Sequence, residues 1–306
     1  MLVSVIVPVY NLENYITDCL DALVVQTRSF DWECIVIDDG STDRSYDVAH
    51  AIIGNDSRFT LIRQKNAGLS SVKNLGISLA TGKYLMFYDG DDIISDGFLE
   101  NLGGIIMGYH PDAVVPRITR NIENFNLKRI SANTCFKGLE AKEFLGSTKN
   151  YGSSWNMIVK RTAYDGVTFP LVLFEDSLVF HEVVGRLDTL VYDKGMDYYY
   201  RIRENSIMNL EKTKEWYEMK LNSHLIFLDG LLQNNCLKAY SERYMQFLHT
   251  YFEVMRRFGV TNETSRFEKL KIPKIYNGKY IYKHLFIQIM GLKMTSKLDK
   301  IKFWLQ

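Results

Sequence analysis

Three aspartates directly follow an apolar segment of the sequence. Residues 83–92 read KYLMFYDGDD, so Asp89, Asp91 and Asp92 follow a strand-like segment with only Gly90 between them. Carboxylates delivered to one point repel one another unless a cation shares them. Mg²⁺ and Mn²⁺ take oxygen ligands and commonly combine one or two carboxylates with phosphate oxygens. The stretch predicts a divalent-cation site, and the alternative is an acidic turn in which Asp89 and Asp92 bond their own backbone.

A second candidate acid, Asp176, lies in the sequence Phe174-Glu175-Asp176. Apolar residues at 178, 179, 183, 184 and 187 follow at helical spacing, which predicts that Asp176 lies near the amino terminus of a helix. The helix dipole favours an ionised carboxylate there. Such a carboxylate at the mouth of a cleft can act as a general base, and a purely structural helix cap is the alternative.

The elements that must position these acids alternate between strands and helices. Apolar segments predict strands at 2–9, 33–37, 59–63 and 83–88, and helical periodicity predicts helices after Asn11, up to about residue 53 and over 69–80. This alternation indicates an α/β fold with a parallel sheet covered on both faces. Ligands bind beyond the carboxyl ends of such strands, where Tyr10, Asp39 and the acids after residue 88 lie.

The helix expected at 69–80 follows Asn66 and places Lys73 and Asn74 one turn in, on the side of the same sheet edge. A cation and an amide there can hold the phosphate or the base of a nucleotide. A solvated helix face is the alternative. Residues 76–83 do not form a phosphate loop, because five residues separate Gly76 from Gly82 and Tyr84 stands where Ser or Thr is needed.

Bulk composition excludes several classes of protein. The chain has 306 residues, 46% hydrophobic content and a net charge of +1, which suits a sizeable core and argues against a nucleic-acid partner. No stretch approaches the length of a membrane span, and the first residues do not resemble a signal peptide, so we expect a cytoplasmic protein. The cysteines are widely spaced and expected to be reduced and buried: Cys19, Cys34, Cys135 and Cys236.

Five segments together resemble a known family. SVIVPVYN, IVIDDGSTD, NAGLSSVKNLGI, GKYLMFYDGDD and FEDSLVF occur in this order over about residues 2–210, and this pattern is similar to that of inverting family 2 glycosyltransferases with the GT-A fold. WNMIVKR and YYYRIRENSIM also resemble segments of members that assemble bacterial polysaccharides. The resemblance implies transfer of a sugar, with inversion, from a nucleotide-sugar donor to a saccharide acceptor.

The resemblance also implies roles for individual residues. Asp89 and Asp91 would form the DxD pair, with Asp89 towards the ribose and Asp91 on Mn²⁺ or Mg²⁺, while Asp176 would be the catalytic base. The donor would usually be a uridine diphosphate sugar. Its expected contacts are Tyr10 and Asp39 at the base, Asn66 and Lys73 elsewhere on the nucleotide, and Arg201 and Arg203 near the diphosphate. The residues expected near the sugar or the acceptor are Asp92, Trp155 and Glu175.

Two departures from the family pattern bear on these roles. Lys73 stands where ARNxG members carry Arg, so the charge is kept but the planar fork is lost. The QxxRW signature of processive members is absent, which favours transfer of a single sugar. A catalytically silent nucleotide-sugar-binding subunit of a transferase complex is one alternative, and the intact Asp89, Asp91 and Asp176 count against it. A nucleotidyltransferase is another, but it would need a glycine-rich basic loop after the first strand, and residues 10–13 offer none.

The organisation expected along the chain is a catalytic domain at 1–211 and a helical region at 212–306. The catalytic domain would have a nucleotide-binding half at about 1–95 and an acceptor half at about 96–211. Between residues 266 and 302 ten Lys or Arg residues, interleaved with apolar and aromatic residues, face only two acids, Glu268 and Asp299. Such a basic amphipathic tail suits an anionic membrane surface, where a lipid-linked saccharide would be the acceptor; a solvated face or a homodimer contact are the alternatives.

Overall fold

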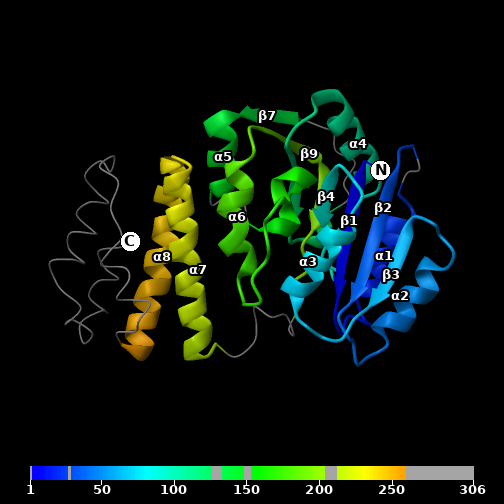
Figure 1. The fold of residues 1–306 in the computed structure, drawn as a ribbon, viewed down its shortest axis with the longest axis horizontal. Coiled ribbons are helices and arrows are strands. Elements are labelled where there is room, and N and C mark those ends of the chain that lie inside the picture. Colours follow the sequence, from blue (N-terminus) through cyan, green and yellow to red (C-terminus); the bar gives the residue numbers. More distant parts are fainter. Residues whose placement is uncertain (1, 27–28, 126–132, 148–152, 204–211, 260–306) are drawn as a thin grey trace.

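The computed structural model describes residues 2–26, 29–125, 133–147, 153–203 and 212–259 (Figure 1). Its strands are β1 (Val3–Val9), β2 (Trp32–Asp38), β3 (Phe59–Arg63), β4 (Tyr84–Phe87), β5 (Ile93–Ile94), β6 (Ala113–Thr119), β7 (Asn133–Lys137), β8 (Ile158–Lys160) and β9 (Thr189–Tyr199). Its α-helices are α1 (Ile16–Val24), α2 (Ser45–Ile53), α3 (Leu69–Leu79), α4 (Phe98–Tyr109), α5 (Gly138–Gly146), α6 (Glu175–Gly185), α7 (Lys214–Gln233) and α8 (Leu237–Phe258). Short 3₁₀ helices are η1 (Ile122–Asn124), η2 (Ser154–Asn156) and η3 (Arg161–Tyr164).

The strands form one mixed sheet in the order β3-β2-β1-β4-β8-β6-β9-β5, with β7 also paired to β9. The first four strands of this order are parallel, as the alternation of strands and helices predicted. The strand β8 then runs antiparallel to both β4 and β6. Because β1, β2 and β4 point the same way, the turns that follow them meet at one edge of the sheet.

Two apolar cores lie on opposite faces of this sheet. Val5 and Val7 of β1 pack with α1 and α4 on one face, while Ile6 packs with α3 on the other. This alternation is the period of two that a strand imposes on its side chains. Both faces are therefore buried, which explains why the strand segments read as continuous apolar runs instead of alternating ones.

The helices α7 and α8 form an antiparallel pair at the opposite end of the molecule from α1 and α2 (Figure 1). Phe227 of α7 stacks on Phe180 of α6 with ring centroids 4.9 Å apart. Gly146, at the end of α5, sits so close to α7 and α8 that an added Cβ would lie 2.5 Å from Leu231 and 3.0 Å from Ala239. Residues of α7 and α8 therefore share a core with the preceding part of the chain.

The structure also tests the expectations for the cysteines and for membrane-spanning helices. Cys19, Cys34 and Cys236 are buried, but Cys135 is exposed on β7, so the prediction of four buried thiols was wrong at that position. Its strand pairs with β9 on one side only and keeps mostly exposed side chains. No helix of the described residues is long and apolar enough to cross a membrane. The basic segment 266–306 lies outside the described residues.

Candidate functional site

The turn after β4 brings three carboxylates together. One ligand oxygen from each of Asp89, Asp91 and Asp92 lies within 4.8 Å of the others. Gly90 allows this turn to pack tightly on β1, because a Cβ there would lie 2.8 Å from the Pro8 carbonyl oxygen and 2.9 Å from the side chain of Leu12. The acids are thus held at the sheet edge by close backbone packing, and their all-oxygen donor set fits a hard divalent cation.

Asp92 is the most deeply buried of the three, with 1% of its surface exposed. The hydroxyl of Tyr198 donates to Asp92 Oδ2 at 2.8 Å and the backbone N–H of Arg201 donates to Oδ1 at 2.8 Å. Burial, followed by the charges of Asp89 and Asp91, raises the pKa of Asp92 well above its ordinary value. Asp92 therefore ties the end of β9 to the acidic turn, while its sequence assignment as a sugar or acceptor contact stays a prediction.

The residues after β9 bring two arginines to the same place. Arg203 forms an ion pair with Asp91, and Arg201 forms one with Asp18 of α1 at 2.6 Å. Both guanidinium groups also lie over the ring of Tyr15, at 5.3 Å for Arg201 and 5.7 Å for Arg203. Sequence reasoning placed these arginines near the diphosphate of a donor, and the structure brings them beside the acids expected to hold that diphosphate's cation.

Asp89 differs from its neighbours because no described residue donates a hydrogen bond to its carboxylate. Burial and then the charge of Asp91 raise the pKa of Asp89 to about 7, although Lys73 opposes this rise. The charges of Asp176 and Glu175 raise the same pKa further, so these acids lie within electrostatic reach of the turn. The turn carries more negative charge than its surroundings neutralise, which is the condition that favours cation binding.

Lys73 is the main cation on the opposite side of the site. It is 1% exposed, and its Nζ donates to Glu175 Oε1 at 2.7 Å and to Asp176 Oδ1 at 2.6 Å. Burial alone would lower the pKa of Lys73, but the charges of Asp176 and Glu175 outweigh it and raise that pKa. Lys73 therefore stays protonated beside the two acids, a contact that the sequence did not predict.

The position of Asp176 follows from the loop before α6. Asn74 of α3 forms two hydrogen bonds with the backbone of Phe169, both 2.9 Å long, and fixes the start of this loop. Phe174 then adopts a left-handed conformation with φ 63° and ends the loop at the first residue of α6. As predicted, Asp176 lies in the first turn of a helix, where its Oδ1 also accepts a 2.7 Å hydrogen bond from Ser154 Oγ.

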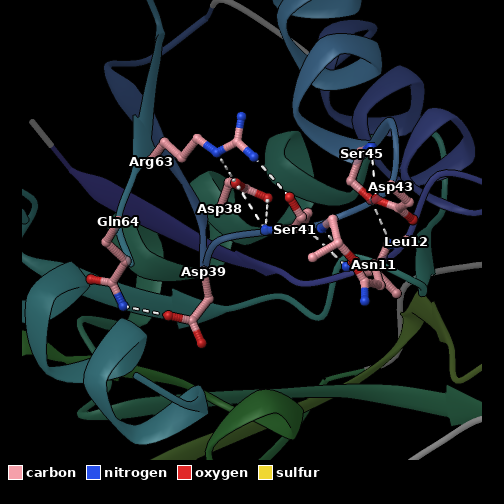
Figure 2. Close-up of polar contacts among 10 residues, drawn as sticks. Asn11, Leu12, Asp38, Asp39, Ser41, Asp43, Ser45, Arg63 and Gln64 are labelled. Carbon is pink, nitrogen blue, oxygen red and sulfur yellow. Dashed lines mark hydrogen bonds and ion pairs between the residues drawn. The ribbon is translucent and has the colours of Figure 1, made fainter. Parts of the chain in front are cut away.

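The turn after β2 carries two aspartates that the chain itself satisfies (Figure 2). Asp38 pairs with Arg63 at 3.1 Å and accepts hydrogen bonds from the backbone N–H of Ser41. Asp39 accepts three hydrogen bonds: 2.7 Å from Gln64 Nε2, and 2.9 and 2.8 Å from the backbone N–H groups of residues 67 and 68. The Asp39 carboxylate is thereby held at the carboxyl edge of the sheet, where its role towards a nucleotide base stays a prediction.

The remaining predicted residues lie around the same edge. Tyr10 directly follows β1 and is 46% exposed, and Asn66 is exposed in the turn before α3. Trp155 stacks on Tyr200 with ring centroids 4.9 Å apart and packs on Tyr198 at 5.4 Å. This ring stack joins η2 to the end of β9 and gives the site an aromatic wall.

Sequence reasoning missed three residues that shape the site. Tyr198 holds Asp92, Ser154 holds Asp176, and Asp18 holds Arg201. Ser154 adjoins Trp155 and Tyr198 lies in the YYYRIR segment, so their places in the recognisable segments were the available signal. Asp18 carried no signal, because it reads as an ordinary exposed acid of α1.

The sequence that forms this site matches a known protein family. Residues 4–168 match the sequence profile described as Glycosyl transferase family 2, which is more than half of the chain. The chain belongs to glycosyl transferase family 2. A glycosyltransferase of this family transfers a glycosyl group, and the acids described above lie at the edge of its sheet where α/β proteins bind ligands.

Three relatives illustrate the range of this glycosyltransferase family. The glycosyltransferase GlyA of Streptococcus pneumoniae serotype 4 is 31% identical over 70% of this chain, which spans 32% of GlyA. EpsH of Bacillus subtilis, named as a glycosyltransferase, is 30% identical over 88% of this chain and 81% of EpsH. The minor teichoic acid biosynthesis protein GgaB of Bacillus subtilis is 22% identical over 76% of this chain and 27% of GgaB.

Solved structures of two glycosyltransferases share the fold, and confirm the predicted GT-A class. TarS 1–349 of S. aureus in complex with UDP-GlcNAc aligns with a TM-score of 0.63 and 23% identity over 89% of this chain and 77% of that TarS chain. The mannosyltransferase PcManGT of Pyrobaculum calidifontis, in complex with GDP-Man and Mn²⁺, aligns with a TM-score of 0.58 and 17% identity over 87% of this chain and 78% of PcManGT.

Proposed function

We propose that this glycosyltransferase moves a single sugar from a uridine diphosphate sugar to a saccharide acceptor, with inversion, in the assembly of a cell-surface polysaccharide. The observation that carries the proposal is the convergence of Asp89, Asp91 and Asp92 within 4.8 Å at the end of β4, opposite Asp176. The UDP-GlcNAc bound by TarS and the polysaccharide-related relatives support the donor and the pathway.

A divalent cation is part of this proposal. Asp91 would hold Mn²⁺ or Mg²⁺, Asp89 would face the ribose, and the Mn²⁺ in the PcManGT complex supports this choice of metal. The bound ion would supply Lewis-acid stabilisation of the charge that develops on the departing diphosphate. Arg203 and Arg201 lie beside the same acids and would add positive charge towards that group.

Asp176 is the proposed base that accepts the proton of the acceptor hydroxyl. The hydrogen bonds that described residues donate to Asp176 both reach Oδ1, which leaves Oδ2 for the acceptor. Lys73 and Ser154 fix the orientation of the carboxylate through these two hydrogen bonds. These contacts support a positioning role for Lys73 beside the base as well as its predicted contact with the nucleotide. Attack from the side opposite the diphosphate would invert the anomeric configuration.

The acceptor side of the proposal rests on fewer described contacts. Trp155 and Tyr200 form a stacked wall, and such aromatic faces suit the apolar face of a sugar ring. Glu175 is buried against Lys73, so we propose that it shapes the acceptor pocket through that pair. The lipid-linked acceptor, the membrane contact through 266–306, the homodimer, the cytoplasmic location and the boundary at residue 211 stay predictions.

The test is an assay of the purified chain with a panel of nucleotide-sugars, Mn²⁺ and saccharide acceptors, followed by NMR of the anomeric centre of the product. Asp176→Asn should lower transfer by about 10²–10⁴-fold, as expected for loss of a general base. Its binding of the donor should stay near that of the wild type. Asp91→Asn should lower both transfer and Mn²⁺-dependent donor binding.

Asp21→Asn, an exposed site on α1, is the matched control and should behave like the wild type. Retention of configuration, or transfer by Asp176→Asn near the wild-type rate, would contradict the assigned chemistry. Binding of nucleotide-sugars without transfer to any acceptor would instead favour the silent-subunit alternative.

A further inference from the structure

A cavity of about 590 Å³ lies at the opposite edge of the sheet from the acids. It is lined by the amino end of β4, the residues at and after the end of β8 and the last turn of α4. Because β4 runs from this cavity to Asp89, a full strand separates the two places. Its volume is within the range of small-molecule sites, so it is a candidate site independent of sugar transfer.

The floor of this cavity is apolar. Ile106 and Met107 of α4 line it together with Leu2 and Tyr84. Met107 is 58% exposed, although it adjoins a buried helix face. The Tyr84 hydroxyl donates to the Pro111 carbonyl oxygen at 2.6 Å, so its polar group is satisfied and only its ring contributes to the lining. The surface offered here suits a hydrocarbon chain.

The rim of the same cavity is cationic, with Lys83, Lys160 and Arg161 among its lining residues. Lys160 is neutralised by Asp112, whose Oδ1 lies 2.6 Å from Nζ. Neither Lys83 nor Arg161 has an acidic partner among the described residues. Arg161 donates one hydrogen bond from Nε to the Gly82 carbonyl oxygen at 3.0 Å, which orients its guanidinium group without neutralising it.

The two uncompensated cations lie on neighbouring chain segments, Lys83 directly before β4 and Arg161 directly after β8. The backbone N–H of Arg161 donates to the Lys83 carbonyl oxygen at 2.8 Å, which extends the antiparallel register of Tyr84 and Lys160 by one pair. Like charges directly opposite in a ladder are unfavourable. An anion between them would relieve that repulsion, and a phosphate group accepts hydrogen bonds from both kinds of cation.

We propose that this cavity binds an amphipathic phosphate, in which an aliphatic chain occupies the apolar floor and the phosphate group contacts Lys83 and Arg161. A ligand must contact both the apolar lining and the cationic rim to bind tightly. Inorganic phosphate lacks the first contact and an uncharged alcohol lacks the second. The site is separate from the sugar-transfer site, so this proposal does not depend on the donor or the acceptor.

Isothermal titration with decyl phosphate tests the proposal, with inorganic phosphate and decanol as probes of the two halves of the ligand. Wild-type protein should bind decyl phosphate measurably and the two other probes far more weakly. Lys83→Gln should weaken decyl phosphate binding by roughly tenfold, as expected for loss of a charge-assisted contact. Met107→Trp, which fills the floor from an exposed position, should weaken it at least as much.

Lys194→Gln, at an exposed position of β9, is the matched control and should bind like the wild type. Both cavity variants should keep the wild-type sugar-transfer rate and melting temperature. Equal binding by the wild type, Lys83→Gln and Met107→Trp would overturn the proposal. Binding of decanol as tight as that of decyl phosphate would also overturn it, because the cations would then have no role.

Flotation of the full chain with phosphatidylcholine vesicles, with and without phosphatidic acid, identifies the source of the phosphate. Loss of flotation in Lys83→Gln and Met107→Trp would support a membrane lipid as the ligand. Unchanged flotation, together with Lys83-dependent binding of decyl phosphate, would support a soluble phosphate ester. Absence of decyl phosphate binding to the wild type would overturn the site itself.

Discussion

The turns after β2 and after β4 both present aspartates to the same edge of the sheet, but their charges are compensated differently. Asp39 accepts three hydrogen bonds from the chain, and Asp38 is paired with Arg63 (Figure 2). Asp89 accepts none from the described residues, and its pKa is raised to about 7 by burial and by Asp91. Similar acidic turns thus carry carboxylates that the chain itself compensates in one case and excess negative charge in the other.

The difference separates acids that the chain compensates from acids that it leaves with excess negative charge. A carboxylate with several backbone donors stabilises the loop that supplies them. A carboxylate crowded by other acids destabilises the folded protein unless a ligand or a cation compensates it. The excess charge of the turn after β4 favours an external cation, so substitutions at compensated and at uncompensated acids should have different effects.

Removal of the chain's own compensating cation should have the largest effect on stability. Lys73→Met would leave the buried Glu175 and the half-buried Asp176 without their cation, and should lower the free energy of unfolding by about 3–5 kcal/mol. Urea denaturation at pH 8 measures this change. Adding Glu175→Gln to the variant should recover part of the loss. A Lys73→Met protein as stable as the wild type would show that these acids are compensated elsewhere.

Asparagine substitutions in the two turns should change stability in opposite directions. Asp39→Asn should lower the free energy of unfolding by about 1–3 kcal/mol, because the amide cannot accept all three hydrogen bonds. Asp89→Asn should raise it by about 1–3 kcal/mol in metal-free buffer at pH 8, because it removes a repelled charge. Denaturation curves of the two variants measure these changes in the free energy of unfolding. Changes of the same sign would contradict the distinction between the two turns.

The same contrast predicts a pH dependence of stability. The pKa of Asp89 rises from the ordinary 3.8 to about 7 on folding, so its ionisation disfavours the folded state. Its contribution to stability is fully present below pH 4 and is lost as the pH rises towards 7. In metal-free buffer the gap in stability between Asp89→Asn and wild type should therefore widen over this window and stay constant above it. Parallel stability curves for the two proteins would contradict the cause assigned to this pKa.

Local patterns predicted much of the fold. β3 occupies the predicted residues 59–63, and Asp176 lies in the first turn of α6 as the apolar spacing indicated. These features depend on neighbours in the sequence, which fix periodicity and helix ends. Residues 97–149 are mixed in pattern and less readable from the sequence, since β7 is largely exposed and β6 changes register between Pro116 and Arg117.

Long-range pairs at the site could not be predicted. The contact between Lys73 and Asp176 joins residues 103 positions apart, and that between Arg203 and Asp91 joins residues 112 apart. Neither pair has a spacing that a helix or strand would impose, because the order of β4, β8, β6 and β9 in the sheet brings them together. The sequence predicted which residues belong to the site, but the contacts between them depend on this topology.

The most direct test of the central claim is a titration of Mn²⁺ in the presence of UDP, with free Mn²⁺ measured by electron paramagnetic resonance. The account predicts one bound Mn²⁺ per chain for the wild type and for Asp38→Asn, and a large loss of binding for Asp91→Asn. Equal Mn²⁺ binding by wild type and Asp91→Asn would contradict the claim that the acids after β4 hold a divalent cation for the donor diphosphate.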